Sequence, residues 1–164
     1  MNSQAEAEIL ALLEEHSAAL RRKDARGVIA CRAADPVLFS LAPPLRVHNP
    51  GPEGLDAWFA TWDGLIGYEI HELRIAADGD VAFCHGFARM TGTKTDGVKV
   101  DLWFRITLGL RRTEEGWAIV HEHDSVPFHM DGSLRAAVDL VPEAPGQAIR
   151  PSAGASSRTP TQPQ

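Results

Sequence analysis

The stretch FRITLGLRRTEEGWAIVHEHDSVP, residues 104–127, decides the fold class of this sequence. Two runs of apolar and β-branched residues flank Thr113-Glu-Glu-Gly116, which is a turn signal. Strands are therefore expected over Val98–Arg112 and Trp117–Ser125. Together they predict the last hairpin of an antiparallel sheet.

Two further strands are predicted upstream of this hairpin. Tyr68–Ala76 alternates between apolar and polar residues, and Val81–Thr91 is a second run of strand-forming residues. Asp78-Gly79-Asp80 and Lys94–Gly97 supply the turns on either side of the second run. The second half of the chain is therefore expected to be a four-stranded meander.

The first half of the chain is predicted to be helical with one early strand. Residues 4–22 carry apolar side chains at helical spacing, and Asp24 can cap a second short helix, which Pro36 ends. A strand over Val37–Ala42 and a third helix over about Glu53–Trp62 follow. This order predicts an α+β, cone-shaped fold, in which helices cover the concave face of a curved antiparallel sheet.

Composition sets the domain boundary and the classes of partner. The chain has 164 residues and a net charge of −6, which argues against a nucleic-acid partner and against an acidic membrane surface. The expected domain is residues 1–141, because residues 142–164 form a Pro/Ser/Ala-rich stretch with too little apolar surface to fold. This tail is expected to be disordered. With no signal peptide in the sequence, the expected location is cytoplasmic.

The two faces of the long strand over Val98–Arg112 differ in character. One face is apolar throughout, and the other mixes charged, polar and aromatic residues: Leu102, Phe104, Ile106, Leu108 and Leu110 against Asp101, Trp103, Arg105 and Thr107. A mixed face is typical of a ligand pocket, and an exposed apolar face requires a partner. We therefore expect the mixed face to line the pocket and the apolar face to form a homodimer interface.

At this point the chain resembles the SnoaL-like branch of the nuclear-transport-factor-2-like superfamily, which also holds ketosteroid isomerases, polyketide cyclases and the kinase hub domain. The resemblance runs over residues 4–128, and its most specific part is the Arg-Arg, turn, Gly-Trp, Ile-Val-His-x-His-x-Ser pattern of the final hairpin. It implies a cone-shaped α+β fold with a pocket between helices and sheet. It also implies dimerisation through the outer face of the sheet.

The resemblance also implies candidate site residues. Arg89 matches a pocket arginine of the hub domain, Thr107 falls near a second one, and Asp124 stands at the third position, as an acid does in cyclase-like members. The steroid isomerase constellation is not reproduced, because His16 replaces its oxyanion-hole tyrosine and Ser40 replaces its general base. Classical steroid isomerisation is therefore not expected.

Each candidate has a chemical role and a structural alternative. Asp124 and His16 are the expected acid/base residues, although an ion pair with arginine or a hydrogen-bonded core position would also explain them. The expected ligand-binding residues are Arg89, Arg105, His85, Trp103, Trp58, Thr107 and Ser40. No metal site or cofactor is expected, because His121 and His123 lack a third ligand on their strand face. Cys31 and Cys84 are expected to be reduced core residues.

The sequence favours a protein that binds a small, largely apolar organic ligand. If it is an enzyme, acid/base chemistry without a cofactor on a carbonyl compound is expected: isomerisation, cyclisation, or a lyase-type hydration. The alternative is a non-catalytic ligand-binding or dimerisation module. A dehydratase-like or oxygenase-like relative is not separated from these by the sequence.

Overall fold

The four strands of the meander are present: three extend beyond their predicted ranges, and the strand predicted over Val98–Arg112 is shifted by one residue. The computed structural model of the protein describes residues 3–48 and 51–143. The elements in chain order are α1 (Ser3–Arg21), α2 (Ala25–Ala30), β1 (Arg32–Phe39), β2 (Val47–His48), α3 (Pro52–Phe59), β3 (Trp62–Asp78), β4 (Val81–Lys94), β5 (Lys99–Thr113) and β6 (Gly116–Ser125). Most of the predicted tail, residues 144–164, lies outside the described residues.

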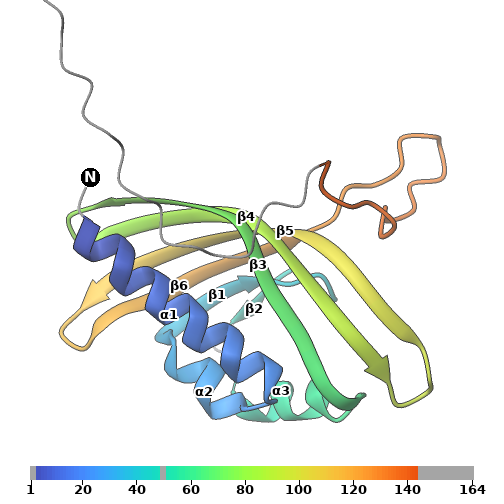
Figure 1. Ribbon diagram of the computed structural model, residues 1–164, viewed down its shortest axis with the longest axis horizontal. Coiled ribbons are helices and arrows are strands. Elements are labelled where there is room, and N and C mark those ends of the chain that lie inside the picture. Colours follow the sequence, from blue (N-terminus) through green and yellow to red (C-terminus); the bar gives the residue numbers. More distant parts are fainter. Residues whose placement is uncertain (1–2, 49–50, 144–164) are drawn as a thin grey trace, which may run out of the picture.

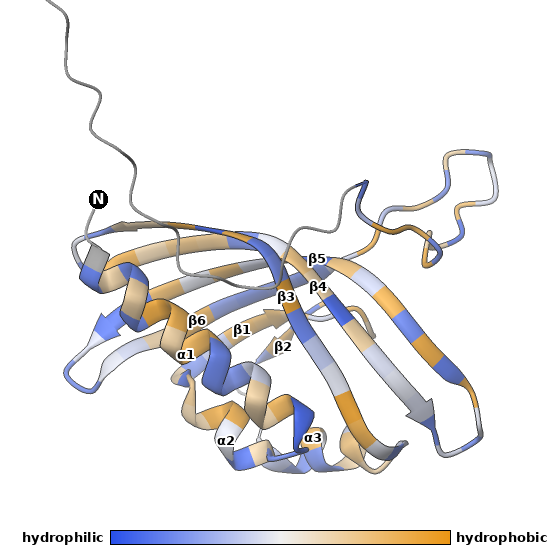
Figure 2. Ribbon diagram, in the orientation of Figure 1, coloured by the Kyte–Doolittle hydropathy of each residue, from blue (hydrophilic) through white to orange (hydrophobic). Residues whose placement is uncertain are grey.

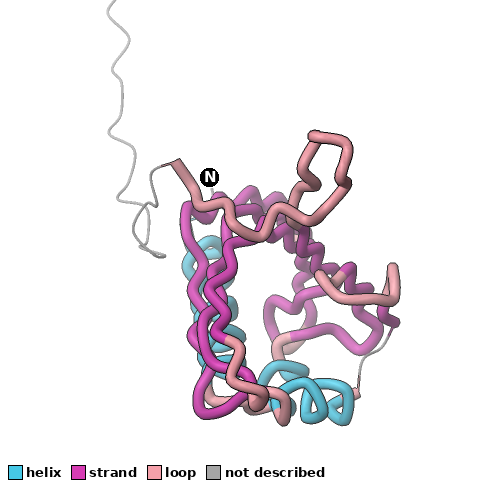
Figure 3. Tube along the Cα trace, turned by 90° about the vertical axis from the view of Figure 1, so that its right-hand side faces the viewer, coloured by secondary structure: helices cyan, strands magenta, loops and turns pink. Residues whose placement is uncertain are grey.

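The strands form one sheet in the order β2-β1-β6-β5-β4-β3. All neighbours are antiparallel except β1 and β6, which run parallel. Figure 1 shows the sheet curving over the helices, with α1 lying along it and α2 and α3 beneath its lower end. Figure 3 shows the same arrangement from the side. The α+β fold with a curved, mostly antiparallel sheet is confirmed.

The second helix is shorter than the sequence predicts. The backbone N–H of Gly27 donates a hydrogen bond of 2.8 Å to Asp24 Oδ1, so Asp24 is the N-cap as expected. The helix ends at Ala30, however, and β1 begins at Arg32. Pro36 lies within β1, at the irregularity between Arg32 and Val37, where a strand tolerates a residue with no N–H.

The helices cover the apolar face of the sheet, so the predicted orientation of the sheet is wrong. Phe104, Ile106, Leu108 and Leu110 are at most 5% exposed and form one core with Ile9 and Leu13 of α1. The apolar stripe of α1 has to be buried, and the most apolar sheet face removes the most surface from water. Figure 2 shows the alternating hydropathy along α1 and the strands that produces this match.

A bulge at Val120 changes the alternation of β6. Gly109 of β5 pairs with His121, whereas the next residue, Leu110, pairs with Ile119, so Val120 has no partner on β5. Ile119 faces the core before the bulge, where it is 0% exposed, and Glu122 faces it after the bulge, where it is 8% exposed. The extra residue therefore places two acidic side chains, Glu122 and Asp124, on the covered face of the sheet.

Candidate functional site

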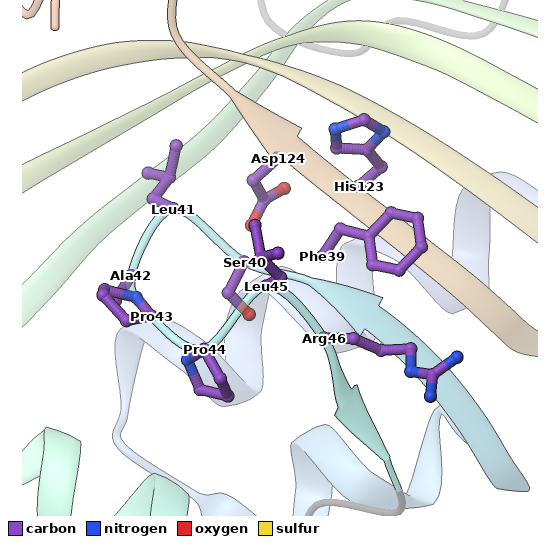
Figure 4. Close-up of a pocket in the computed structure, with 10 residues that line it drawn as sticks. All are labelled: Phe39, Ser40, Leu41, Ala42, Pro43, Pro44, Leu45, Arg46, His123 and Asp124. Atoms are coloured by element: carbon purple, nitrogen blue, oxygen red, sulfur yellow. The ribbon is translucent and has the colours of Figure 1, made fainter.

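An open pocket lies where β6 ends beside the loop that joins β1 to β2. Its volume is about 1130 Å³, and its lining combines an apolar loop with the end of β6: Phe39, Ser40, Leu41, Ala42, Pro43, Pro44, Leu45, Arg46, His123 and Asp124. Figure 4 shows the Asp124 carboxyl group directed toward this loop, while Phe39 and His123 lie together on the other side. Asp124 is the acidic residue of this lining, which is otherwise apolar apart from Ser40, Arg46 and His123.

Asp124 has the environment of a carboxyl group that keeps its proton. The residue is half-buried, but its Oδ1 atom is enclosed and has no hydrogen-bond partner among the described residues. Burial raises the pKa of Asp124 well above its ordinary value, the negative charge of Glu122 raises it further, and Arg32 opposes both. A neutral carboxyl group in such a site can donate a hydrogen bond to a ligand oxygen.

A buried ion pair lies behind Asp124. Arg32 Nη2 is 3.0 Å from Glu122 Oε2, and the two side chains are 6% and 10% exposed. The Nε and Nη1 atoms of Arg32 are buried without a hydrogen-bond partner in the described part of the chain. The guanidinium group of Arg32 therefore pairs with one carboxylate, that of Glu122, and its Nε and Nη1 groups have no acceptor among the described residues.

His16 and Tyr68 complete the polar interior. His16 of α1 is 2% exposed, and its Nε2 atom has no partner within the described residues. Burial lowers the pKa of His16, so the ring is neutral at pH 7. Tyr68 of β3 is 4% exposed, and burial followed by the charges of Asp124 and Glu122 raises its pKa well above 10. Both groups are thus uncharged neighbours of the acidic pair.

Asp124 and His16 both face the interior between helices and sheet, as expected, but Asp124 lines the pocket and His16 does not. Ser40 lines the same pocket as Asp124. Trp58 does not: it is half-buried on α3 and packs against Trp62, with ring centroids 5.7 Å apart.

The prediction that Arg89 and Arg105 share the pocket with Asp124 is wrong. Arg89 pairs across the strands with Trp103, and its guanidinium group forms two hydrogen bonds, of 2.9 and 2.8 Å, with Asp101 on the outer face. Arg105 is exposed on that face. His85, Trp103 and Thr107 lie there as well. The physical reason is the reversed sheet orientation, which turns the whole mixed face away from the helices.

Sequence reasoning missed Arg32, Tyr68 and the role of Glu122. Glu122 forms its ion pair with Arg32. Arg32 is a single basic residue in the segment CRAADPV. An acidic residue two positions before Asp124 in a strand was the one available signal, since both must share a strand face.

The described residues contain neither a cluster of three metal-ligating side chains nor a helix that could span a bilayer. Within residues 3–48 and 51–143, no three His, Cys, Asp or Glu side chains gather in a way that could hold a metal ion. None of the helices described there is long and apolar enough to span a bilayer. Cys31 and Cys84 are buried and unpaired, and burial raises the pKa of Cys84 to about 12, so this thiol is unreactive.

The cone-shaped α+β fold is that of the nuclear-transport-factor-2-like class of proteins. The SnoaL-like domain matches residues 9–129, well over half of the chain, and the chain belongs to this SnoaL-like family. The family has isomerase, dehydratase and ligand-binding members. No curated protein matches the chain at a significant level.

Solved structures agree with this assignment. A nuclear-transport-factor-2-like protein of unknown function from Pseudomonas putida is 32% identical, with a TM-score of 0.75, over 87% of this chain and 99% of that chain. A candidate calcium/calmodulin-dependent protein kinase II association domain from Xanthomonas campestris is 25% identical, with a TM-score of 0.58. The match covers 72% of this chain and 84% of that chain. A candidate dehydratase from Streptomyces avermitilis is 14% identical, with a TM-score of 0.67, over 76% and 97%, and shows the shared fold alone.

Proposed function

We propose that this protein binds a small, largely apolar carbonyl compound in the pocket beside Asp124 and catalyses acid/base chemistry on it. The observation that carries the proposal is the enclosed, unpartnered Oδ1 atom of Asp124, at the end of an apolar lining. Asp124, when protonated, donates a hydrogen bond to the carbonyl oxygen of the ligand. This interaction strengthens as the oxygen gains negative charge, which is the requirement for enolisation, isomerisation or dehydration.

His16 is the proposed proton acceptor. It is 2% exposed and is not among the residues that line the pocket, so the proposal requires a path from the bound ligand to its ring. Its ring is neutral at pH 7, because burial lowers its pKa, and a neutral imidazole can accept a proton. In the proposed step, the C–H bond next to the carbonyl group breaks and its proton moves to His16. The electron pair shifts toward the oxygen that Asp124 holds. Return of the proton at another carbon completes an isomerisation. Transfer of the proton from His16 to a β-hydroxyl group, which then leaves as water, completes a dehydration.

The apolar loop sets the expected ligand class. Leu45 is 98% exposed and Leu41 is 38% exposed, and both belong to the pocket lining. A hydrocarbon body lying against them would remove apolar surface from water, which favours binding by about 25 cal/mol per Å². The ligand is therefore expected to carry one polar oxygen at the Asp124 end and hydrocarbon elsewhere.

Deuterium exchange tests this function without knowledge of the natural substrate. We expect the protein to accelerate exchange of the α-protons of 2-tetralone, an apolar aromatic ketone, in D₂O, as followed by ¹H NMR. Asp124→Asn and His16→Gln should each reduce the acceleration at least tenfold, whereas Asp101→Asn should leave it unchanged. If the protein leaves every member of a panel of cyclic ketones at its uncatalysed exchange rate, the enzymatic proposal is wrong.

The second candidate function is ligand binding without catalysis, and it is favoured by the openness of the Asp124 pocket to solvent. Water in a pocket of this kind weakens electrostatic stabilisation of charge on a ligand. The neutral dye N-phenyl-1-naphthylamine distinguishes the two candidates. Saturable dye fluorescence that the ketones displace, without any proton exchange, would identify a binding module.

We also propose that a second copy of the chain covers the outer face of the sheet. The residues that support this differ from the expected ones, since Leu102–Leu110 contributes its apolar side chains to the core. The outer face instead carries Phe83, which is 50% exposed, together with Phe87 and Trp103, which are half-buried. Partly exposed aromatic side chains are typical of protein interfaces. A cytoplasmic location stays a prediction, which cell fractionation tests.

A further inference from the structure

Glu122 and Asp124 form an unusual pair of acidic side chains. They are two residues apart on β6, and both face the covered side of the sheet, opposite Leu108 and Ile106 of β5. Side chains at such positions are about 7 Å apart along a strand. Two negative charges at that separation, within an apolar interior, repel each other strongly.

Arg32 determines which of the two acids carries the negative charge. Its Nη2 atom is 3.0 Å from Glu122 Oε2, and within the described residues it donates no hydrogen bond to Asp124. Glu122 is therefore the partnered carboxylate, and the Oδ1 atom of Asp124 is left without a partner in the described residues. Arg32 therefore stabilises the negative charge of Glu122 by an ion pair that Asp124, on the same strand face, does not have.

The other groups around this interior carry no charge at neutral pH. Tyr68 on β3 keeps its proton because burial and the nearby acids raise its pKa. His16 on α1 is neutral because burial lowers its pKa. The charges that act on Asp124 within the described chain are thus those of Glu122 and Arg32.

We propose that the Arg32–Glu122 ion pair is a positioning device for Asp124: Glu122, fixed by Arg32, opposes negative charge on the neighbouring carboxyl group, so Asp124 reaches the pocket as a hydrogen-bond donor. This inference rests on the proposed function, in which Asp124 holds the ligand oxygen. Arg32 and Glu122 are positioning residues, since they act through Asp124 and not on the ligand.

A purely structural role for the pair makes a different prediction. A buried ion pair that only joins β1 to β6 would change the free energy of unfolding when it is altered. It would not lower the titration midpoint of Asp124 on loss of Glu122 and raise that midpoint on loss of Arg32. If the pair sets the charge of Asp124, both of these shifts must occur. Removing the negative partner must favour ionisation of Asp124, and removing the positive partner must oppose it.

The test is a ¹³C NMR titration of the Asp124 side-chain carboxyl group in the full-length protein, with its signal assigned from Asp124→Asn. We expect Glu122→Gln to lower the titration midpoint by about 1–3 pH units, because Asp124 then lies beside an arginine without its carboxylate. Arg32→Met should raise the midpoint above that of the wild type. An unchanged midpoint in both variants would overturn the proposal.

A double variant keeps the test decisive if a single variant does not fold. Arg32→Met with Glu122→Leu replaces the ion pair by apolar side chains, an exchange that buried pairs often tolerate. Its midpoint should lie below that of the wild type, because the effect of Glu122 on Asp124 exceeds that of Arg32. A midpoint equal to or above that of the wild type would contradict the role of the pair.

The titration needs no ligand, so it is independent of the exchange assay. If the expected order of midpoints appears and ketone exchange does not, the ion pair sets the charge of Asp124 and the enzymatic proposal fails. If exchange is catalysed and the midpoints do not move, the enzyme stands and the positioning role is overturned.

Discussion

Asp124 of β6 is the direct cross-strand neighbour of Ile106 of β5, and Ile106 is 1% exposed. A carboxyl group therefore lies beside one of the most deeply buried aliphatic side chains of the sheet. This relationship explains why the interior of the protein is acidic and apolar at once. It also makes the ionisation of Asp124 a contribution to stability that can be measured.

The contribution of Asp124 to the free energy of unfolding of the wild type should decrease as the pH rises. The folded state raises the pKa of Asp124, so it binds this proton more tightly than the unfolded chain does. Stability is then lost from about pH 4, the unfolded value, up through the folded value, at no more than about 1.4 kcal/mol per pH unit. Asp124→Asn removes this loss. Urea unfolding from pH 4 to pH 8 measures it, and curves of equal slope for the two proteins would contradict the prediction.

Asp101→Asn is the matched control for this experiment. Asp101 is exposed, and Arg89 lowers its pKa, so the sign of its contribution is the opposite. The effect should be small, because solvent screens an exposed pair. A large change in this variant would show that the method does not report on the interior.

His16 should make the protein sensitive to acid. Burial lowers the pKa of His16, so below about pH 6.5 the unfolded chain takes up a proton that the folded chain does not. Stability is lost as the pH falls through this value. Replacing His16 by leucine removes this loss, so the decrease in unfolding free energy from pH 8 to pH 5 should be smaller in His16→Leu than in the wild type. An equal pH dependence in His16→Leu and the wild type would count against a buried neutral histidine.

The two faces of the sheet should respond differently to a new charge. Phe104 is 5% exposed in the core, and replacing such a side chain even by alanine costs about 3–5 kcal/mol, so Phe104→Glu should unfold the domain. Phe83→Glu lies on the outer face and should keep the fold but yield a monomer. Circular dichroism and sedimentation distinguish these outcomes. A wild type that sediments as a monomer would remove the proposed interface.

Truncation after Glu143 should leave the melting temperature nearly unchanged. Residues 144–164 contain Ile149 as their one aliphatic residue other than alanine, so they bring little apolar surface to bury. Calorimetry of the truncated chain beside the full chain measures the difference. A decrease of more than several degrees would mean that the tail packs on the domain.

The elements of the fold were predictable from the sequence, because alternation and turn residues act locally. The strands on either side of Asp78-Gly79-Asp80 are present, and Gly79 has the positive φ of 57° that this turn requires. Alternation divides a strand into two faces, but it does not say which face another element covers. That choice depended on α1, whose Ile9 and Leu13 match the apolar face of β5.

The candidate site was predicted only in part, for a related reason. Asp124 and His16 were found from a family resemblance and from a helical stripe, both of which are visible in the sequence. The partnership of Arg32 with Glu122 joins residues 90 positions apart, and the parallel pairing of β1 with β6 brings them together. No local pattern carries that information.

The orientation of the two acids depends on the bulge in β6. Because Val120 is the one unpaired position of the bulge in β6, a strand that kept all its residues but lacked the bulge would pair Val120 with Gly109. That pairing would turn His121 and His123 toward the interior and send Glu122 and Asp124 to the outside. Loss of Val120 itself would make Ile119 and His121 consecutive partners of Leu110 and Gly109, with both acids still facing inward. The bulge is therefore what lets this sequence present a pair of acids, and not a pair of bases, to the interior of the cone.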